Sequence, residues 1–307
     1  MERHHVGLIG CGNWGRHILR DLVTLGCKVT AVARSEASRQ RAAEGGADVV
    51  PDLGNLPAVD GVVVATPSAT HAAVVEAVLP LGVPVFVEKP LTVDLADAER
   101  IVRAAPDRLF VMDKWRYHPG VEALAEIARS GELGPVIGLR TTRVGWGNPH
   151  DDTDVVWHLT PHDLAIALEI LGCIPEPRFA VAVWHAGAWP HGLLGVLGDG
   201  PWVVTEISAR SVERRRVVVL HCRDGVAVLA DGYADHVLIR RGPHGTGEAE
   251  EERRAISTEL PLYRELAAFV RHLEGGPPPK SSAAEGLANV RAIAALRSLA
   301  GLPASGD

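Results

Sequence analysis

The 307-residue sequence predicts an α/β protein of two domains, in which a parallel sheet flanked by helices precedes an α+β domain with a mainly antiparallel sheet. Three observations lead to this fold class. Short apolar runs alternate with helical patterns as far as Val111, a glycine-rich turn follows the first run, and later strands succeed one another without helices between them. A chain of this length is also too long for one typical core.

The first domain is predicted over residues 1–118. Its strands are the apolar runs at 6–9, 29–33, 62–65, 83–87 and 109–112. Between the first two runs, residues 16–25 repeat apolar side chains at helical spacing before Gly26, a residue type that commonly ends helices. This order of strand, turn, helix and strand is that of a βαβ unit.

The second domain is predicted over residues 119–307. Its helices are expected at 121–130, near 161–171, at 262–273 and at 283–300, and its strands at 136–144, 179–184, 193–197, 202–208, 216–220, 226–229 and 237–239. The charged segment 248–254 follows three glycines and is predicted to be a solvated hairpin tip or loop.

Composition excludes several kinds of partner. A net charge of -7 disfavours nucleic acid, and the basic run Arg214-Arg215-Arg216 is interpreted as the solvated start of a strand. The four cysteines are scattered, which fits a reducing cytoplasm and gives no metal-ligand spacing. The N-terminus has no signal-peptide pattern, and no apolar run approaches the roughly 20 residues that span a bilayer.

The segment Gly10-Cys11-Gly12-Asn13-Trp14-Gly15 matches the G-x-G-x-x-G pattern between a predicted strand and a predicted helix. In such turns the first glycine permits the tight turn, the second admits a pyrophosphate and the third allows close helix packing. The helix N-terminus then offers N–H groups and a positive dipole end to the phosphates. The sequence therefore predicts a dinucleotide site of the Rossmann kind.

The residues after the second strand bear on which nicotinamide cofactor is used. An acidic residue usually binds the ribose hydroxyls of NAD there, whereas this chain has Arg34 and Ser35, with Arg39 further on. These side chains are suited to a 2′-phosphate, so NADP(H) is predicted over NAD(H). The alternative is that Arg34 only stacks on the adenine.

Three motifs in order carry a resemblance to a known family. They are the glycine turn, Ala65-Thr66-Pro67 followed by His71, and Glu88-Lys89-Pro90 after an apolar strand. With Trp115-Arg116-Tyr117-His118-Pro119 and the turn Gly131-Glu132-Leu133-Gly134, the chain resembles the glucose-fructose oxidoreductase and inositol dehydrogenase family, Gfo/Idh/MocA, over nearly its whole length.

The resemblance implies a fold and a reaction. It implies a Rossmann domain, an open-faced and mainly antiparallel second sheet, C-terminal helices that return toward the first domain, and cofactor contacts from residues 65–67, His71 and 88–90. It also implies hydride transfer between a nicotinamide and a hydroxyl or ketone of a sugar, nucleotide-linked sugar or cyclitol. Lys89 is then the general acid or base, with its pKa lowered by desolvation and its bond to Pro90 cis.

The segment Trp157-His158-Leu159-Thr160-Pro161-His162-Asp163 predicts a helix that begins with Thr160 as N-cap and Pro161 in its first position. His162 would then lie in the first turn, where the helix dipole favours a neutral imidazole able to assist Lys89. His158 stands where the family has an aspartate, so it is a second candidate relay or a substrate ligand. A zinc site is not expected, because the pair lacks the metalloprotease glutamate and Pro161 should interrupt the helix.

Four further side chains are candidate substrate ligands from the layout that the resemblance implies: Arg116, Tyr117, Arg143 and Trp146. The loop 148–154 before the predicted helix is a candidate substrate entrance, although a solvated loop is the simpler interpretation. Two alternative functions stay open, which are NADPH-dependent reduction of a cyclic imine and a non-catalytic dinucleotide-binding regulator. Because open-faced sheets commonly pair, a homodimer or homotetramer is predicted.

Overall fold

The structure is a computed structural model that describes residues 4–147, 152–184, 189–242 and 249–303. The chain divides into two compact units, one formed by residues 1–114 and 260–290 and the other by residues 115–259 and 291–307. The division into domains at residues 118 and 119 stays a prediction.

The first unit contains a six-stranded parallel sheet in the order β3-β2-β1-β4-β5-β6. The order reverses direction between β1 and β4, which is the switch point at which doubly wound sheets bind dinucleotides. The strands are β1 (His5–Ile9), β2 (Lys28–Val32), β3 (Asp48–Val50), β4 (Gly61–Val64), β5 (Val85–Glu88) and β6 (Leu109–Met112). Five of them confirm the sequence expectations, and the short strand β3 was not foreseen.

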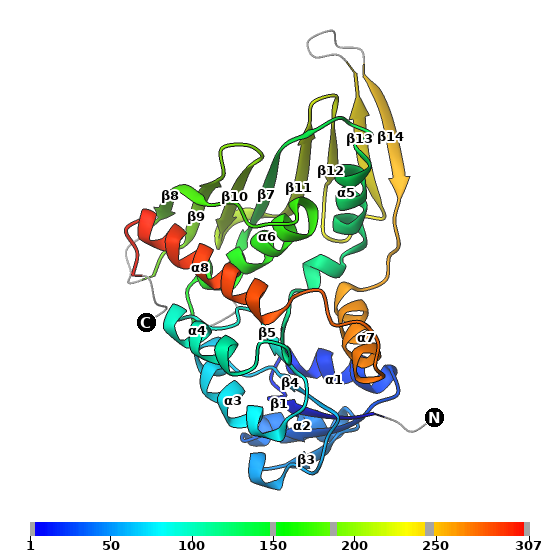
Figure 1. Cartoon of the computed structure of the whole chain (residues 1–307), viewed down its shortest axis with the longest axis vertical. Coiled ribbons are helices and arrows are strands. Elements are labelled where there is room, and N and C mark those ends of the chain that lie inside the picture. Colours follow the sequence, from blue (N-terminus) through cyan, green and yellow to red (C-terminus); the bar gives the residue numbers. More distant parts are fainter. Residues whose placement is uncertain (1–3, 148–151, 185–188, 243–248, 304–307) are drawn as a thin grey trace. The chain divides into compact units, whose positions relative to one another are not determined.

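Helices cover both faces of this sheet (Figure 1). Contacts group α1 (Gly15–Thr24) with α2 (Glu36–Glu44) and α7 (Pro261–Leu273), and α3 (His71–Val78) with α4 (Leu95–Ala104). Short 3₁₀ turns lie at Leu53–Asn55, Ser68–Thr70 and Leu79–Leu81.

Helix α7 is part of the core of the first unit although it is distant in sequence. Phe269 stacks on Phe86 of β5 with ring centroids 4.9 Å apart, and Leu266 is fully buried in the same cluster. Burial of aromatic side chains of this size contributes about 1.5–3 kcal/mol each. The first sheet therefore obtains one of its covering helices from the C-terminal part of the chain.

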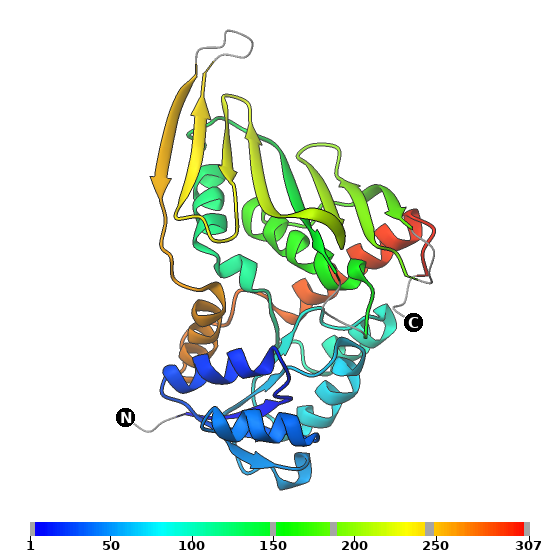
Figure 2. The same cartoon turned by 180° about the vertical axis from the view of Figure 1, so that it is seen from behind.

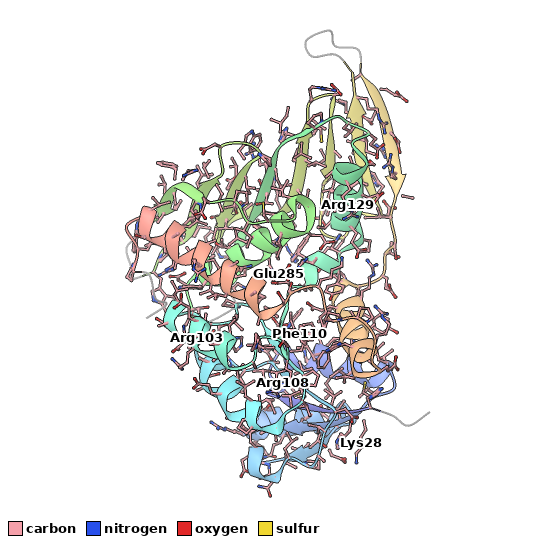
Figure 3. The ribbon with its side chains drawn as sticks, in the orientation of Figure 1. Lys28, Arg103, Arg108, Phe110, Arg129 and Glu285 are labelled. Carbon is pink, nitrogen blue, oxygen red and sulfur yellow. The ribbon has the colours of Figure 1, made fainter. Side chains whose placement is uncertain are left out.

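Helix α8 (Ala283–Leu299) begins beside β6. Ser282 forms a β-bridge with Phe110, and its backbone N–H donates to Glu285 Oε2 at 2.8 Å. The Glu285 N–H in turn faces Ser282 Oγ at 3.3 Å, which makes a capping box at the start of the helix. Figure 3 labels Phe110 and Glu285, the two residues on either side of this junction.

The second unit is built on an eight-stranded mixed sheet in the order β14-β13-β12-β11-β7-β10-β9-β8. All neighbours are antiparallel except β7 and β10, which pair in parallel. Its strands are β7 (Val136–Trp146), β8 (Pro177–Val183), β9 (Gly192–Leu197), β10 (Trp202–Ser208), β11 (Arg210–Cys222), β12 (Gly225–Leu229), β13 (His236–Arg241) and β14 (Glu250–Ala255). A mainly antiparallel sheet is thus confirmed.

Helices α5 (Pro119–Ser130) and α6 (Val155–Leu171) pack on one face of this sheet. Among the residues that the structure describes, no helix covers the opposite face, which Figure 2 shows from behind. The second sheet is therefore open-faced, as the resemblance implies.

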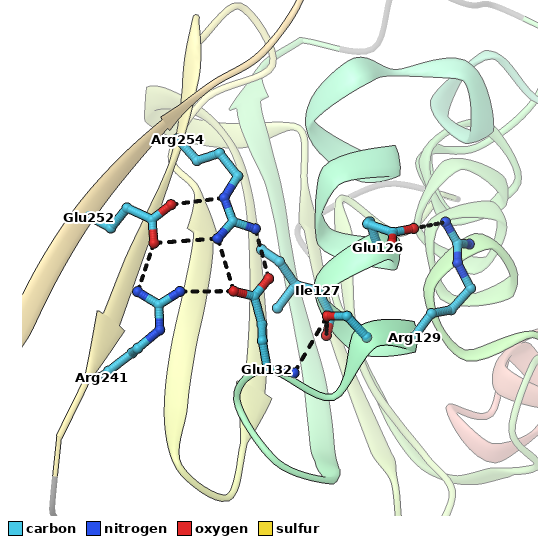
Figure 4. Close-up of polar contacts among 8 residues, drawn as sticks. Glu126, Ile127, Arg129, Glu132, Arg241, Glu252 and Arg254 are labelled. Carbon is cyan, nitrogen blue, oxygen red and sulfur yellow. Dashed lines mark hydrogen bonds and ion pairs between the residues drawn. The ribbon is translucent and has the colours of Figure 1, made fainter.

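A charged cluster joins the outermost hairpin to the turn after α5 (Figure 4). Arg254 of β14 and Arg241 of β13 both donate to Glu132 and to Glu252. These two guanidinium groups lower the pKa of Glu132 to about 2. The expectation of a loop over 248–254 is therefore wrong for its described part, because cross-strand pairs such as Arg241 with Glu252 fix residues 250–255 as an edge strand. Residue 248 lies outside the described residues.

None of the helices in the described ranges combines the length and the apolar character that a membrane span requires.

Candidate functional site

The glycine turn lies between β1 and α1, at the carboxyl end of β1. Gly10 has a positive φ of 94°, and a Cβ on Gly15 would lie 2.4 Å from the Gly10 carbonyl oxygen. A Cβ on Gly12 would meet nothing within 4 Å, so this part of the turn has open space for a ligand. The three positions therefore have the roles that a pyrophosphate-binding turn requires, and the residues present fit a dinucleotide.

Trp14, just before α1, connects this turn to the end of β5. Its indole N–H donates to Glu88 Oε1, and the ammonium group of Lys114 lies 4.0 Å from the centre of its ring. Glu88 Oε2 accepts from the Lys89 backbone N–H at 3.1 Å. The side chain of Glu88 thus bridges the dinucleotide turn and the segment that carries Lys89.

His71 links the two neighbouring loops of the same unit. Its Nδ1 lies 2.8 Å from the Pro90 carbonyl oxygen and its Nε2 lies 3.0 Å from the Thr66 carbonyl oxygen. Burial lowers the pKa of His71, although both carbonyls favour the charged ring. A neutral ring can donate to only one of these two carbonyls. The role of His71 as a cofactor contact stays a prediction. The Lys89–Pro90 bond is cis, as the resemblance implies.

Several polar groups in the residues after β2 form hydrogen bonds with one another. Ser35 is the N-cap of α2 and accepts from the Ser38 N–H, while Arg39 donates to Glu36 and to the Arg34 carbonyl oxygen. Arg34 itself is exposed.

A buried carboxyl group lies on the inner face of α7. Glu265 is fully buried, and neither of its carboxylate oxygens has a hydrogen-bond partner among the described residues. Burial raises its pKa well above the usual range, the charges of Glu88 and Asp113 raise it further, and Lys114 opposes them. Burial therefore favours the protonated form of Glu265. Sequence reasoning missed this residue, because one glutamate on a helix face carries no sign of its burial.

The expected start of the helix that carries His162 is wrong. Helix α6 begins at Val155, with Asp154 as N-cap accepting from the N–H groups of Val156 and Trp157, and Pro161 lies inside it. His162 is therefore not in the first turn, and the dipole argument for its neutrality does not apply. Asp154 is held in place by Arg297, whose Nη1 lies 2.5 Å from Asp154 Oδ2, a partner that only the folded chain provides.

The two candidate histidines lie one turn apart on α6. His158 is half-buried, while His162 is 8% exposed and has its ring centre 6.5 Å from that of Trp115. Because α6 continues through Pro161, the proline does not separate them as expected. In the part of the chain that the structure describes, no group of three His, Cys, Asp or Glu side chains could hold a metal ion.

The candidate substrate ligands occupy different environments in the second unit. Arg143 is buried and bonds Asp163 at 2.8 Å, while Arg116 bonds Glu169 at 3.1 Å. Tyr117 is buried, and Trp146 is 73% exposed beside a cavity of about 300 Å³. That cavity is also lined by Trp189, His191 and Arg210. Residues 148–151 of the expected entrance loop lie outside the described residues.

Residues 4–111 match the model of a family described as an oxidoreductase family with an NAD-binding Rossmann fold, GFO_IDH_MocA. Over these residues the chain is similar to that family, Gfo/Idh/MocA.

Two relatives illustrate the likeness. UDP-N-acetylglucosamine 3-dehydrogenase of Acidithiobacillus ferrooxidans is 32% identical over 192 residues, which cover 60% of this chain and 59% of the relative. Inositol 2-dehydrogenase of Streptomyces avermitilis is 31% identical over 228 residues, which cover 70% of this chain and 65% of the relative. The chain spans 59%, 43% and 41% of the first three curated relatives that it matches, or about half their length.

Solved structures share the fold over almost the whole chain. A structure of the Acidithiobacillus ferrooxidans enzyme has a TM-score of 0.84 at 24% identity and covers 97% of this chain and 98% of its own. Levoglucosan dehydrogenase in complex with NADH and levoglucosan has a TM-score of 0.85 at 15% identity and covers 98% of each chain. At these identities the likeness shows the fold alone.

The protonation state of Glu265 predicts a pH-dependent stability. The unfolded chain releases this proton above the ordinary glutamate pKa of about 4.5, whereas the folded chain retains it, so stability falls as pH rises. The loss is about 1.4 kcal/mol per pH unit until the folded pKa is reached. Glu265→Gln should therefore raise the thermal midpoint relative to wild type at pH 8 more than at pH 5. Glu274→Gln, at the half-exposed end of the same helix, is the control. A Glu265→Gln effect of equal size at both pH values would contradict the protonated state.

Proposed function

We propose that the chain is an NADP-dependent oxidoreductase that transfers hydride between the nicotinamide and a hydroxyl or ketone of a sugar, nucleotide-linked sugar or cyclitol. The observation that supports this most is the bond from Trp14 to Glu88, which joins the dinucleotide turn to the segment containing Lys89. Relatives named as dehydrogenases of inositol and of UDP-N-acetylglucosamine support the same class of reaction. The four cysteines are free, which supports a reducing cytoplasm as its location.

Lys89 is the proposed general acid and base. In the oxidative direction its ammonium nitrogen, in the uncharged form, takes the hydroxyl proton while the carbon loses hydride, and the C–O bond becomes a carbonyl. When bound, the nicotinamide dinucleotide would supply the acceptor or donor of that hydride. The half-buried position of Lys89 and the fixed backbone on either side of it suit such a role.

His162 is proposed to assist Lys89 by a hydrogen bond to the reacting oxygen, and His158 to relay a proton. Their spacing on one continuous helix puts both rings on the same side of α6. The basis for His162 is its burial beside Trp115 rather than the helix dipole. Arg116, Tyr117, Arg143 and Trp146 are proposed to shape the substrate site.

Replacing Lys89 tests the reaction chemistry. Lys89→Ala should lower kcat by roughly 100- to 10,000-fold with little change in dinucleotide affinity, because a general acid or base contributes about that factor. Turnover of a panel of sugars and cyclitols is followed by nicotinamide absorbance. Lys28→Ala, a change at an exposed lysine paired with Asp48, is the matched control. Unchanged turnover in Lys89→Ala would remove Lys89 from the mechanism.

Arg34 is proposed to favour NADP(H) over NAD(H). It is exposed directly after β2, and the nearby Glu36 carboxylate is already paired with Arg39 at 2.6 Å. A guanidinium bond to a phosphate contributes about 1.5–3 kcal/mol.

Arg34→Ala should therefore weaken NADPH binding by roughly 10- to 100-fold and leave NADH binding nearly unchanged. Titration calorimetry with both cofactors measures this difference. Equal affinity of the wild type for NADH and NADPH would disprove the preference.

The open face of the second sheet is the proposed interface of a homodimer or homotetramer. Val181 of β8 and Leu194 of β9 are directly paired and are 47% and 40% exposed, and Phe179 and Val183 lie on the same face. Adjacent exposed apolar side chains of this kind mark association surfaces.

Val181→Asp should therefore shift the protein toward monomer in multi-angle light scattering, because it places a charge within this apolar face. Val212→Asp, at a valine that is 97% exposed on β11, is the control. A wild-type protein that is monomeric at micromolar concentration would refute the proposal.

A further inference from the structure

The basic run Arg214-Arg215-Arg216 on β11 does not act as one solvated surface. Alternate side chains of a strand point to opposite faces of the sheet. Arg216 is paired in register with Arg143 of β7, whose side chain bonds Asp163 of α6. A Cβ on Gly145, two residues further along β7 and so on the same face, would lie 3.9 Å from the Cγ of Arg214. Arg215 is exposed and pairs with Glu213 at 2.6 Å. Arg143, Arg214 and Arg216 thus form a cluster, which we call the arginine cluster.

Of the arginine cluster, only Arg143 forms an ion pair with a carboxylate among the described residues. Arg143 is paired with Asp163, whose other oxygen accepts from Thr205 at 2.8 Å. The hydrogen bonds of Arg216 go to the carbonyl oxygens of Val144 and Arg215, at 2.7 and 2.8 Å.

Burial and the charges of Arg143 and Arg214 lower the pKa of Arg216 to about 10, although Asp163 and Asp231 oppose them. Arg216 is therefore charged at neutral pH and partly desolvated. Removing such a cation from water costs free energy unless an anion pairs with it.

Within the second unit, Trp115 contacts the arginine cluster and lies near His162. The Arg143 guanidinium lies 4.3 Å from the centre of the Trp115 ring, and His118 stacks on Trp115 at 4.9 Å. A Cβ on Gly232 would lie 3.0 Å from the Trp115 ring and 3.6 Å from the Cβ of Arg216, so both side chains lie beside this glycine. His162 lies 6.5 Å from Trp115. The arginines are thus part of the region to which we assign substrate binding.

We propose that Arg214 and Arg216 bind a phosphate or diphosphate group of the substrate, so that the substrate is a sugar phosphate or nucleotide-linked sugar and not a neutral sugar or cyclitol. This inference rests on the proposed function. Guanidinium groups bind phosphate through paired, charge-assisted hydrogen bonds, which a neutral hydroxyl does not match. Arg214 is exposed and faces Tyr233 at 5.9 Å, so it can reorient toward a ligand, while Arg216 is held by backbone carbonyls.

Calorimetric titration of the full chain with saturating NADPH tests this proposal, because the dinucleotide then fills its own phosphate site. The probes are UDP, glucose 1-phosphate and myo-inositol. Wild type should bind at least one of the two phosphorylated probes more tightly than inositol, with an affinity that falls as salt rises. Binding of UDP alone identifies a nucleotide-linked substrate, and binding of glucose 1-phosphate identifies a sugar phosphate.

Arg216→Gln and Arg214→Gln should each weaken that binding by roughly 10- to 100-fold, the size expected for a lost charge-assisted bond. Arg215→Gln, one residue away on the other face, is the matched control and should bind as wild type. Because Arg214 is exposed, its variant keeps the test valid even if Arg216→Gln fails to fold.

The proposal is overturned if the phosphorylated probes bind no better than inositol, or if Arg215→Gln has an effect equal to those of Arg214→Gln and Arg216→Gln. Each is distinguishable from failure of the proposed function. Phosphate binding without any hydride transfer would reject the enzyme and keep the site, whereas turnover of a neutral cyclitol with no dependence on Arg214 or Arg216 would reject the site alone.

Discussion

The close approach of α1 to β1 is the constraint on which the first unit depends. Gly15 can start the helix there only because it has no side chain, since a Cβ at this position would collide with the Gly10 carbonyl oxygen. Gly10 itself adopts a positive φ to turn the chain. This approach places Trp14 where its indole reaches Glu88. One steric requirement thereby positions the dinucleotide turn, the end of β5 and the backbone of Lys89 together.

Buried charge is treated differently in the two units. In the first unit, burial and the charges of Glu88 and Asp113 raise the pKa of Glu265, which favours its uncharged form. In the second unit Asp163 and Asp154 are paired with Arg143 and Arg297 inside the fold. Arg216 follows neither pattern, since carbonyl oxygens bind it without neutralising it. A partly buried cation that no carboxylate pairs with is a candidate binding site for an anionic ligand.

Sequence patterns predicted the elements whose signals are local. The strands of the first sheet are nearly continuous apolar runs, and the glycine turn has its own spacing, so both could be identified directly. The start of α6 was misplaced because Thr160 followed by Pro161 is a common sequence pattern at helix N-termini. In the structure Asp154 is the N-cap, and a buried bond from Arg297 stabilises it there. Strand β14 was missed for a related reason, since its charged residues form a strand only when paired with those of β13.

By itself, the sequence determined the fold class, the resemblance to a known family and the positions of Gly10, Lys89 and His162 along the chain. These features depend on the spacing of residues that are close together in the sequence, so they can be recognised without the structure. Only the tertiary structure decided that Arg214 and Arg216 share a face with Arg143, and that Glu265 is buried among other carboxyls. Burial and charge pairing arise from residues distant in sequence, and their effects on pKa and on ligand chemistry exist only after the chain has folded.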